Sequence, residues 1–360
     1  MLPRRRERKV PVRRVDAGRY AGVTAALAAA MLFGAGTPLA KLLLASVSPW
    51  LLAGFLYLGS GLGLTLYRKV VGLPAVTLPR HEVAWFAGAV VSGGVVAPVL
   101  LMLGLTGMPA SGASLLLNAE GVFTTVLAWF AFKENVDRRI ALGMLAIIAG
   151  AIVLSWPGEV QFIALWPSLA VLGACFAWAV DNNLTRKVSL ADAAWIASIK
   201  GLVAGVVNLA LAFSLGAALP ALLNVAIAML VGFFAYGVSL ALFVVGLRHL
   251  GTARTGAYFS AAPFVGTILA LIMGEPLTPN LLIAGALMGL GLWLHLTEHH
   301  EHAHRHETLE HDHEHVHDEH HLHRHAASDA PGATHKHPHR HETLQHAHPH
   351  FPDTHHRHAH

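Results

Sequence analysis

Ten long apolar stretches fill most of this chain and predict an all-α protein embedded in a membrane. They run over residues 21–45, 50–67, 84–105, 111–132, 140–156, 163–181, 193–215, 222–247, 255–274 and 280–297. Most approach the roughly 20 apolar residues that a helix needs to cross the hydrocarbon core of a bilayer. The stretches are continuous rather than alternating, which favours helices over a β-barrel. Charged residues make up only 13% of the chain, which argues against soluble domains.

The positions of lysine and arginine predict how these helices are oriented. If the ten stretches alternate in direction, 18 basic residues fall on one side of the membrane. They are Arg4, Arg5, Arg6, Arg8, Lys9, Arg13, Arg14, Arg19, Arg68, Lys69, Arg80, Lys133, Arg138, Arg139, Arg186, Lys187, Arg248 and Arg254. The loops expected on the other side, such as 46–49, 106–109 and 275–279, contain none. Because basic loops stay in the cytoplasm, we expect a multi-pass protein of a bacterial-type inner membrane with both termini cytoplasmic.

The membrane part repeats itself once. Residues 104–134 and 246–275 share a Gly-Leu start, a short polar loop, a helix of small residues and a final glutamate. Gly121 and Pro263 occupy the same place near the middle of the two segments. Two units of five helices each must have opposite orientations in the membrane, because five is odd. Inverted repeats with a site near the midplane are typical of secondary transporters.

Several motifs also give the chain a resemblance to a known transporter family. They are Leu32-Phe33-Gly34 with Lys41, the Ala113 to Glu134 segment, Thr255 to Pro276, and the stretches Gly143 to Gly150 and Gly285 to Gly291. On these motifs the chain resembles the EamA-domain family of the drug/metabolite transporter superfamily. Members of that family export or exchange amino acids, drugs, sugars or other metabolites, usually by antiport or proton coupling. The chain departs from the family pattern at Glu120-Gly121, where the family often has proline.

The resemblance covers about residues 20–297 and implies two EamA repeats, so we expect ten transmembrane helices in two inverted five-helix units. It does not cover the tail that follows, which is expected from its composition to be disordered. The segments are a basic cytoplasmic N-terminus (1–19), repeat 1 (20–156), repeat 2 (157–297) and a histidine-rich cytoplasmic tail (298–360). Lipid and a small-molecule substrate are the expected partners. Small residues on several helix faces also permit a homodimer. No catalytic triad, phosphate loop or nucleotide motif is present, which argues against an enzyme, and no nucleic-acid partner is expected.

Glu120 is the strongest candidate for a functional residue within the membrane. An ionisable side chain at mid-bilayer costs about 2.5–3.5 kcal/mol on insertion scales, so its presence needs a reason. Burial favours the neutral form of a carboxyl, so Glu120 could carry a proton or face a cationic substrate. The alternative is a protonated glutamic acid that bonds to a neighbouring helix for packing.

Five further residues complete the predicted substrate or coupling site. Lys200 lies about two turns inside its helix, where it could pair with Glu120 or with an anionic substrate. Lys41 lies near the end of the first stretch, and it could instead extend to the membrane surface. Asn118, Ser260 and Pro263 lie on the small polar stripes of the two repeated helices. Asp181 is expected to be an interfacial cap rather than a pathway residue.

Histidine dominates the tail, with 24 of the 27 histidines between His299 and His360. The tail has few large apolar residues and cannot bury a core, so it is expected to be disordered without metal. Its segment 304–318 recurs at 339–353, and both copies are rich in His-x-His. Neutral imidazole suits Zn, Ni, Co and Cu, so the tail is predicted to bind a divalent transition metal. The candidate ligands are His304, His306, His311, His313, His315, His317, His339, His341, His346, His348 and His350. A solvated tail that tunes charge with pH is the alternative.

Three functions remain open from the sequence. The first is a secondary exporter of a small organic metabolite or drug, which requires no cofactor and uses the tail as a metal buffer or regulator. The second is a transporter of a transition metal or metal chelate that is fed by the tail. The third is a membrane-bound metal sensor or store without transport. The three histidines outside the tail, His81, His249 and His295, fall in loops or at a helix end, which disfavours a metal pathway through the membrane.

Overall fold

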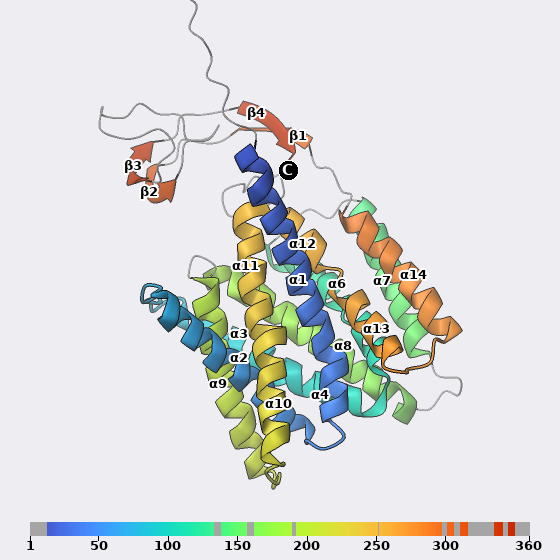
Figure 1. The fold of residues 1–360 in the computed structure, drawn as a ribbon. Helices are drawn as coiled ribbons and strands as arrows, with labels where there is room; N and C mark the ends of the chain where they lie inside the picture. Colours follow the sequence, from blue (N-terminus) through green and yellow to red (C-terminus); the bar gives the residue numbers. More distant parts are fainter. Residues whose placement is uncertain are drawn as a thin grey trace, which may run out of the picture. The chain divides into compact units, whose positions relative to one another are not determined.

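The computed structural model describes residues 13–132, 138–156, 162–188, 192–250 and 252–296, together with four short strands between residues 301 and 349. The chain divides into two compact units, Met1–Leu296 and Thr297–His360. In the described residues the first unit is all-helical (Figure 1). The beginning of its first helix and the end of its last helix lie at the same end of the helical unit.

Helices lie on all ten of the predicted stretches. In the first half they are α1 (Arg13–Leu43), α2 (Pro49–Val71), α3 (Val83–Ala89), η1 (Val90–Val96), α4 (Ala97–Gly107), α5 (Ala110–Leu116), α6 (Ala119–Phe132) and α7 (Arg138–Ser155). In the second half they are α8 (Phe162–Thr185), η2 (Arg186–Val188), α9 (Ala193–Ser214), α10 (Leu222–Gly232), η3 (Phe233–Val238), α11 (Ser239–Leu250), α12 (Thr252–Phe259), α13 (Ala262–Ile272) and α14 (Pro279–Leu296).

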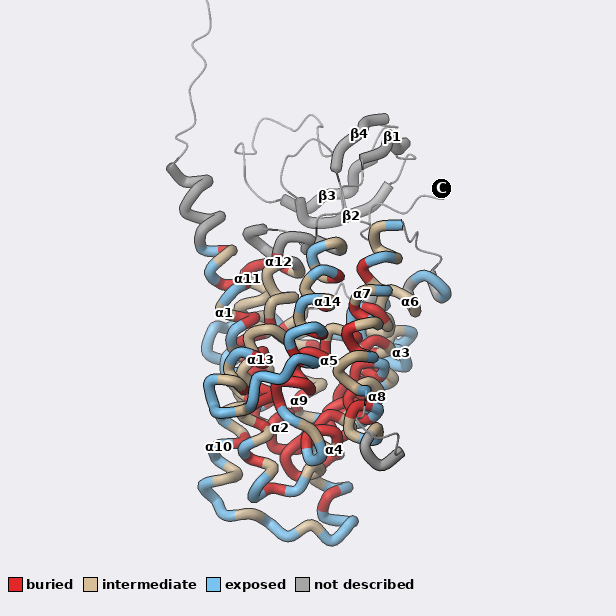
Figure 2. Tube along the Cα trace, turned by 90° about the vertical axis from the view of Figure 1, so that its right-hand side faces the viewer, coloured by how far each residue is buried: buried red, intermediate tan, exposed pale blue. Residues whose placement is uncertain are grey.

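Six spans in the described residues are long and apolar enough to cross a membrane. They are Ala21–Leu43, Pro49–Val71, Val83–Gly107, Arg138–Ser155, Ala193–Ser214 and Leu222–Gly246. The predicted count of ten crossings is therefore only partly supported by helix length and composition. One reason is that α5–α6 and α12–α13 are interrupted, which leaves shorter pieces. Buried residues gather on the inner faces of the helices, while large apolar side chains such as Phe130 are exposed on the outside, as expected next to lipid (Figure 2).

The helices of the repeated segments break at matching places. The first break falls at Leu117 and Asn118, and the second at Ser260 and Ala261. At the second break Pro263 follows at once, and proline has no N–H to continue the helical ladder. At the first break the side chain of Asn118 donates to the Leu115 carbonyl at 2.8 Å, which competes with the backbone for that acceptor. Interrupted helices at membrane depth are typical of transporter binding sites.

Two further spans contain a turn of π-helix. η1 connects α3 to α4, and η3 connects α10 to α11. A π-turn loosens the regular hydrogen-bond ladder and leaves carbonyl groups that need other donors. Within η1 the two buried glycines Gly93 and Gly94 supply such carbonyls.

Four short strands are described in the second unit: β1 (Glu301–Arg305), β2 (Glu310–His315), β3 (His335–Arg340) and β4 (Gln345–Pro349). β1 pairs with β4 and β2 with β3, both antiparallel. The alternating His-x-His pattern has the period of an extended strand. The disorder of the tail without metal stays a prediction. The rest of the tail lies outside the described residues.

Candidate substrate and coupling site

Glu120 lies directly after the break between α5 and α6, and it is half-buried. Its Oε1 accepts a hydrogen bond of 2.8 Å from Nδ2 of Asn182 on α8. The same amide nitrogen lies 3.4 Å from Oγ1 of Thr124, one turn further along α6. The amide of Asn182 therefore connects α8 to two groups of α6, the Glu120 carboxyl and the Thr124 hydroxyl. Asn182 itself is exposed, so this group is accessible from outside the helical core.

Lys200 has a different partner from the two that the sequence suggested. Its Nζ donates to both carboxylate oxygens of Asp181, at 2.6 and 2.7 Å. The side chains of Asp181 and Lys200 are only 7% and 17% exposed, so this ion pair is largely removed from water. The hydroxyl of Thr185 also donates to Asp181, at 2.9 Å. Each buried charge thus has a compensating partner, as burial requires.

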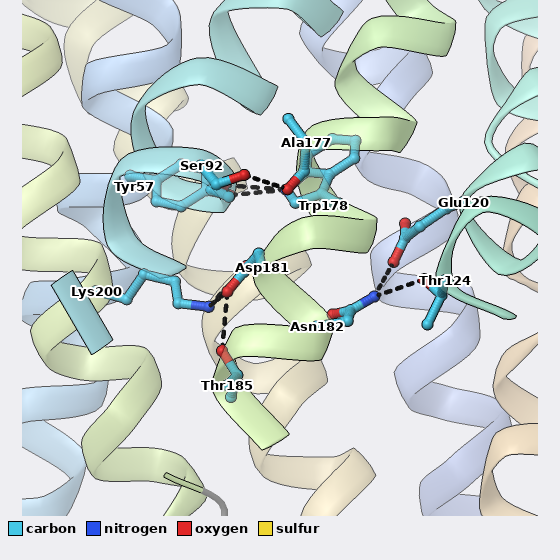
Figure 3. A network of polar contacts seen from close by, with 11 residues as sticks. Tyr57, Ser92, Glu120, Thr124, Ala177, Trp178, Asp181, Asn182, Thr185 and Lys200 are labelled. Carbon is cyan, nitrogen blue, oxygen red and sulfur yellow. Dashed lines mark hydrogen bonds and ion pairs between the residues drawn. The ribbon is translucent and has the colours of Figure 1, made fainter. Parts of the chain in front are cut away.

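The expectation that Asp181 is an interfacial cap is wrong. α8 continues to Thr185, one turn past Asp181, so Asp181 lies within the helix. Its side chain points toward α9, whereas that of the next residue, Asn182, points toward α6 (Figure 3). One turn of α8 therefore carries both polar contacts, the Asp181–Lys200 pair on one side and the Glu120–Asn182 bond on the other. The pairing of Asp181 with Lys200 was not predictable from the sequence, because it depends on how α8 and α9 pack.

The carbonyls of η1 are bound by side chains from three other helices. The Gly93 carbonyl accepts from the Tyr57 hydroxyl at 2.8 Å and from the Trp178 ring nitrogen at 3.0 Å. The Gly94 carbonyl accepts from the amide of Asn208 at 3.1 Å. A side chain at Gly93 would clash with Asp181, so a residue without a Cβ is needed where the carboxylate packs against η1. The ion pair and the π-turn thus form one polar network with α2, α8 and α9.

The other predicted site residues lie away from this network. Asn118 bonds within its own helix break, and Pro263 begins α13. Ser260 lies at the second break. The Nζ of Lys41 donates to the carbonyls of Leu105 and Met108, the latter at 3.0 Å.

Sequence reasoning missed the contact of Glu275. Its two carboxylate oxygens accept from the backbone N–H groups of Ala110 and Ser111, at 2.7 and 2.8 Å. These are orphan donors at the N-terminus of α5, and a carboxylate is well suited to them. The sequence singled out Glu275 only as a repeat and family mark. The positive φ of 101° at Gly274, which ends α13, turns the chain toward α5 and could have suggested a cap.

No group of three or more metal-ligating side chains is found in the described part of the chain. Of the predicted metal ligands, His304, His311, His313, His315, His339, His346 and His348 lie on the strands of the tail. His306, His317, His341 and His350 lie outside the described residues. The metal-binding role of the tail therefore stays a prediction.

One turn of α8 thus contacts a half-buried carboxyl, Glu120, and carries one member of a largely buried ion pair, Asp181 and Lys200. Ionisable groups at this depth typically mark substrate or ion pathways.

Comparisons with known proteins agree with this architecture. Residues 20–156 and 165–297 each match the model of the EamA-like transporter family. An uncharacterized transporter of Methanothermobacter thermautotrophicus is 28% identical over 293 residues, which cover 76% of this chain and 85% of that protein. A probable amino-acid metabolite efflux pump of Salmonella typhimurium is 39% identical over 85 residues, 23% of this chain and 28% of that protein.

A solved crystal structure shares the fold with a TM-score of 0.57 at 19% identity, over 77% of this chain and 95% of that one. The family model matches two segments that together span most of the chain. Membership of the family therefore does not depend on the individual relatives or on the solved structure. The chain belongs to the EamA-like transporter family, and it is a membrane transporter.

Proposed function

We propose that this protein is a secondary active exporter of a small organic metabolite or drug in a bacterial-type inner membrane. Its ten predicted helices would form two inverted units, 20–156 and 157–297, with both termini in the cytoplasm. The observation that carries the proposal is the turn of α8 that places Asn182 on Glu120 and Asp181 on Lys200. Packing alone does not require four such polar side chains among membrane helices.

Glu120 is the group that couples transport to a driving ion or binds a cationic part of the substrate. It is accessible, and its partner Asn182 is an amide that can donate to the ionised carboxyl or accept from the protonated one. A change of protonation therefore leaves the contact between α6 and α8 satisfied in either state. This property is useful in a cycle in which the carboxyl gains and loses a proton.

Amino acids and related zwitterions are the first substrates to test. Two relatives, from Salmonella typhimurium and Escherichia coli, are described as probable amino-acid metabolite efflux pumps. The pair of Asp181 and Lys200 presents one negative and one positive group, the complement of an ammonium and a carboxylate on one small molecule. A ligand with a single charge that separates the pair would bind only Asp181 or only Lys200. The other side chain would then be a buried charge without a partner, which is costly in free energy.

The experiment is transport into proteoliposomes with the wild type, Glu120→Gln and a matched control, Glu82→Gln. We expect counterflow of a labelled amino acid or drug by the wild type and the control. Glu120→Gln should abolish transport driven by a pH gradient, because the amide cannot release a proton. A fully active Glu120→Gln variant would remove Glu120 from the mechanism.

The histidine-rich tail supports a second candidate, transport of a transition metal or metal chelate. In the preferred proposal the tail binds Zn, Ni, Co or Cu as a cytoplasmic buffer or regulator. Metal accumulation in cells that express the full chain or a version ending at Glu298, with Glu120→Gln as a third variant, separates the two. If expression of the full chain changes the metal content of the cells, and both the truncation and Glu120→Gln abolish that change, the metal is the transported substrate. A sensor or store without transport is contradicted by any concentrative flux.

A further inference from the structure

Two side chains of opposite charge hold the turn between α4 and α5. Lys41, in the last turn of α1, donates to the carbonyls of Leu105 and Met108 at the C-terminus of α4. Glu275, which follows α13, accepts from the N–H groups at the N-terminus of α5. A cation at a helix C-terminus and an anion at a helix N-terminus both complement the helix dipole. We call Lys41, Glu275 and the backbone groups they bind the clasp.

The clasp lies at one end of the helical unit. α1 begins on the side of the helical unit where α14 ends (Figure 1). Lys41 is in the last turn of α1, so it lies on the opposite side. α8 runs back toward the first end, and Asp181 and Asn182 lie in its last two turns. Asn182 is exposed and Glu120 half-buried, whereas at the far end the clasp holds the turn between α4 and α5.

The clasp connects the two repeats across a surface of small residues. Glu275 comes from the second repeat, while α4 and α5 belong to the first. Next to it α1 and α13 meet at Gly34, where an added Cβ would lie 3.0 Å from Val265 Cβ and 3.1 Å from the nitrogen of Gly266. Gly266 in turn lies against Ser114 of α5. Such a surface has few interlocking side chains, so its helices can slide past one another once the polar contacts release.

We propose that Lys41 and Glu275 form a gate that closes the protein on the side opposite its termini and opens during each transport cycle. This inference rests on the proposed function, because a secondary active exporter must open its substrate site to each side of the membrane in turn. Every group of the clasp lies at the end of a helix, where water can replace the lost partner. Opening therefore exchanges one set of hydrogen bonds for another and does not leave a charge buried in lipid. The hydrogen bonds of the clasp therefore stabilise the closed state but still allow the protein to open.

The test measures how fast a membrane-impermeant maleimide reaches single cysteines in the full chain. Cys175 is the only native cysteine, so Cys175→Ala gives the background. Ser114, on α5, is buried, so Ser114→Cys reports whether opening of the clasp exposes this position to the extracytoplasmic side, and Asn182→Cys reports from the cytoplasmic side. Each reporter is combined with Lys41→Met or Glu275→Gln. Lys69→Met and Glu82→Gln, at the opposite end of the unit, are the matched controls.

We expect both clasp variants to speed the labelling of Ser114→Cys about tenfold, which corresponds to a shift of roughly 1.4 kcal/mol. The labelling of Asn182→Cys should slow, because a protein that opens on one side closes on the other. The controls should change neither rate. Unchanged labelling of Ser114→Cys overturns the proposal, and so does faster labelling at both reporters, since that indicates a loosened fold. The labelling assay needs no substrate, so it tests the gate independently of transport. If the clasp variants change labelling as expected but the protein shows no measurable flux, the gate stands and only the transport proposal is refuted.

Discussion

Asp181 and Lys200 account for each other's presence among the membrane helices. A lone ammonium or carboxylate at that depth would be strongly disfavoured, while the pair, with two contacts of 2.6 and 2.7 Å, is satisfied. The hydroxyl of Thr185 occupies a further lone pair of the carboxylate. The pair therefore fixes α8 against α9, on the side of α8 away from the Glu120–Asn182 hydrogen bond.

Removing one partner of this pair should be much worse than removing both. We expect Lys200→Met to destabilise the protein by about 3–5 kcal/mol, because Asp181 is left buried without its cation. The double variant Asp181→Asn with Lys200→Met should recover most of that loss. Thermal unfolding of the purified full chain in detergent measures both effects. A double variant as unstable as Lys200→Met would show that the pair's charges are not what stabilises this contact.

The same variants separate structure from function at this site. If the pair binds a zwitterion, the double variant should be stable and still fail to bind amino acids. Ligand-induced shifts of the melting temperature with an amino acid, its decarboxylated amine and its deaminated acid report this directly. Equal shifts in the wild type and the double variant would assign the pair a structural role alone.

At the scale of helices, the backbones of α2 and α9 approach so closely at Gly61 and Gly201 that a side chain at Gly201 would not fit between them. A Cβ added to Gly201 would lie 2.7 Å from the Cα of Gly61 and 2.9 Å from the carbonyl oxygen of Tyr57. Backbones that approach this closely gain van der Waals contact, which is a principal source of association between membrane helices. Because α9 carries Lys200 and α2 carries Tyr57, this contact also sets the spacing of the polar network.

Gly201→Ala should push these two helices apart. We expect a loss of about 1–3 kcal/mol from overpacking, measured as a lower melting temperature. Gly256→Ala on α12 is the matched control, because an added Cβ there meets nothing within 4 Å. The control should be neutral or more stable by up to about 1 kcal/mol, since alanine is the better helix former. Equal effects at both positions would contradict a close contact at Gly201.

At the scale of the whole molecule, the membrane unit and the histidine-rich tail are separate compact units. The cross-strand pairing of β1 with β4 and of β2 with β3 lies entirely within the tail. In the register of β2 and β3, His311, His313 and His315 lie opposite His339, His337 and His335. The tail can therefore be removed without cutting a helix of the transporter.

A chain that ends at Glu298 should keep its fold and its organic transport but lose metal binding. We expect most bound Zn, Ni, Co or Cu to disappear, because 24 of the 27 histidines lie between His299 and His360. Metal content of the purified protein and its melting temperature are the two measurements. Metal retained by the truncated chain would place the binding groups in the membrane unit and favour the metal-transport alternative.

The sequence by itself determined the class of this protein. Continuous apolar stretches predict helices wherever the structure describes them, because a backbone in lipid must satisfy its own hydrogen bonds. The repeat of residues 104–134 in 246–275 was visible in the sequence, whereas the helix breaks at Leu117–Asn118 and Ser260–Ala261 were not predicted from it. It also supported the EamA resemblance, which the family model confirms. Glu120 was identified from its charge in an apolar helix, and its functional role remains a prediction.

Only the tertiary structure decided which polar groups meet. Lys200 pairs with Asp181, which the sequence placed at an interface, and Lys41 and Glu275 bind the ends of α4 and α5. Each contact joins residues that are 19 to 165 positions apart in the chain. Hydropathy reports how a residue interacts with lipid or water, but not which side chain of another helix it faces. That choice is made by helix rotation and close packing, which bring a charge and its partner within hydrogen-bond distance.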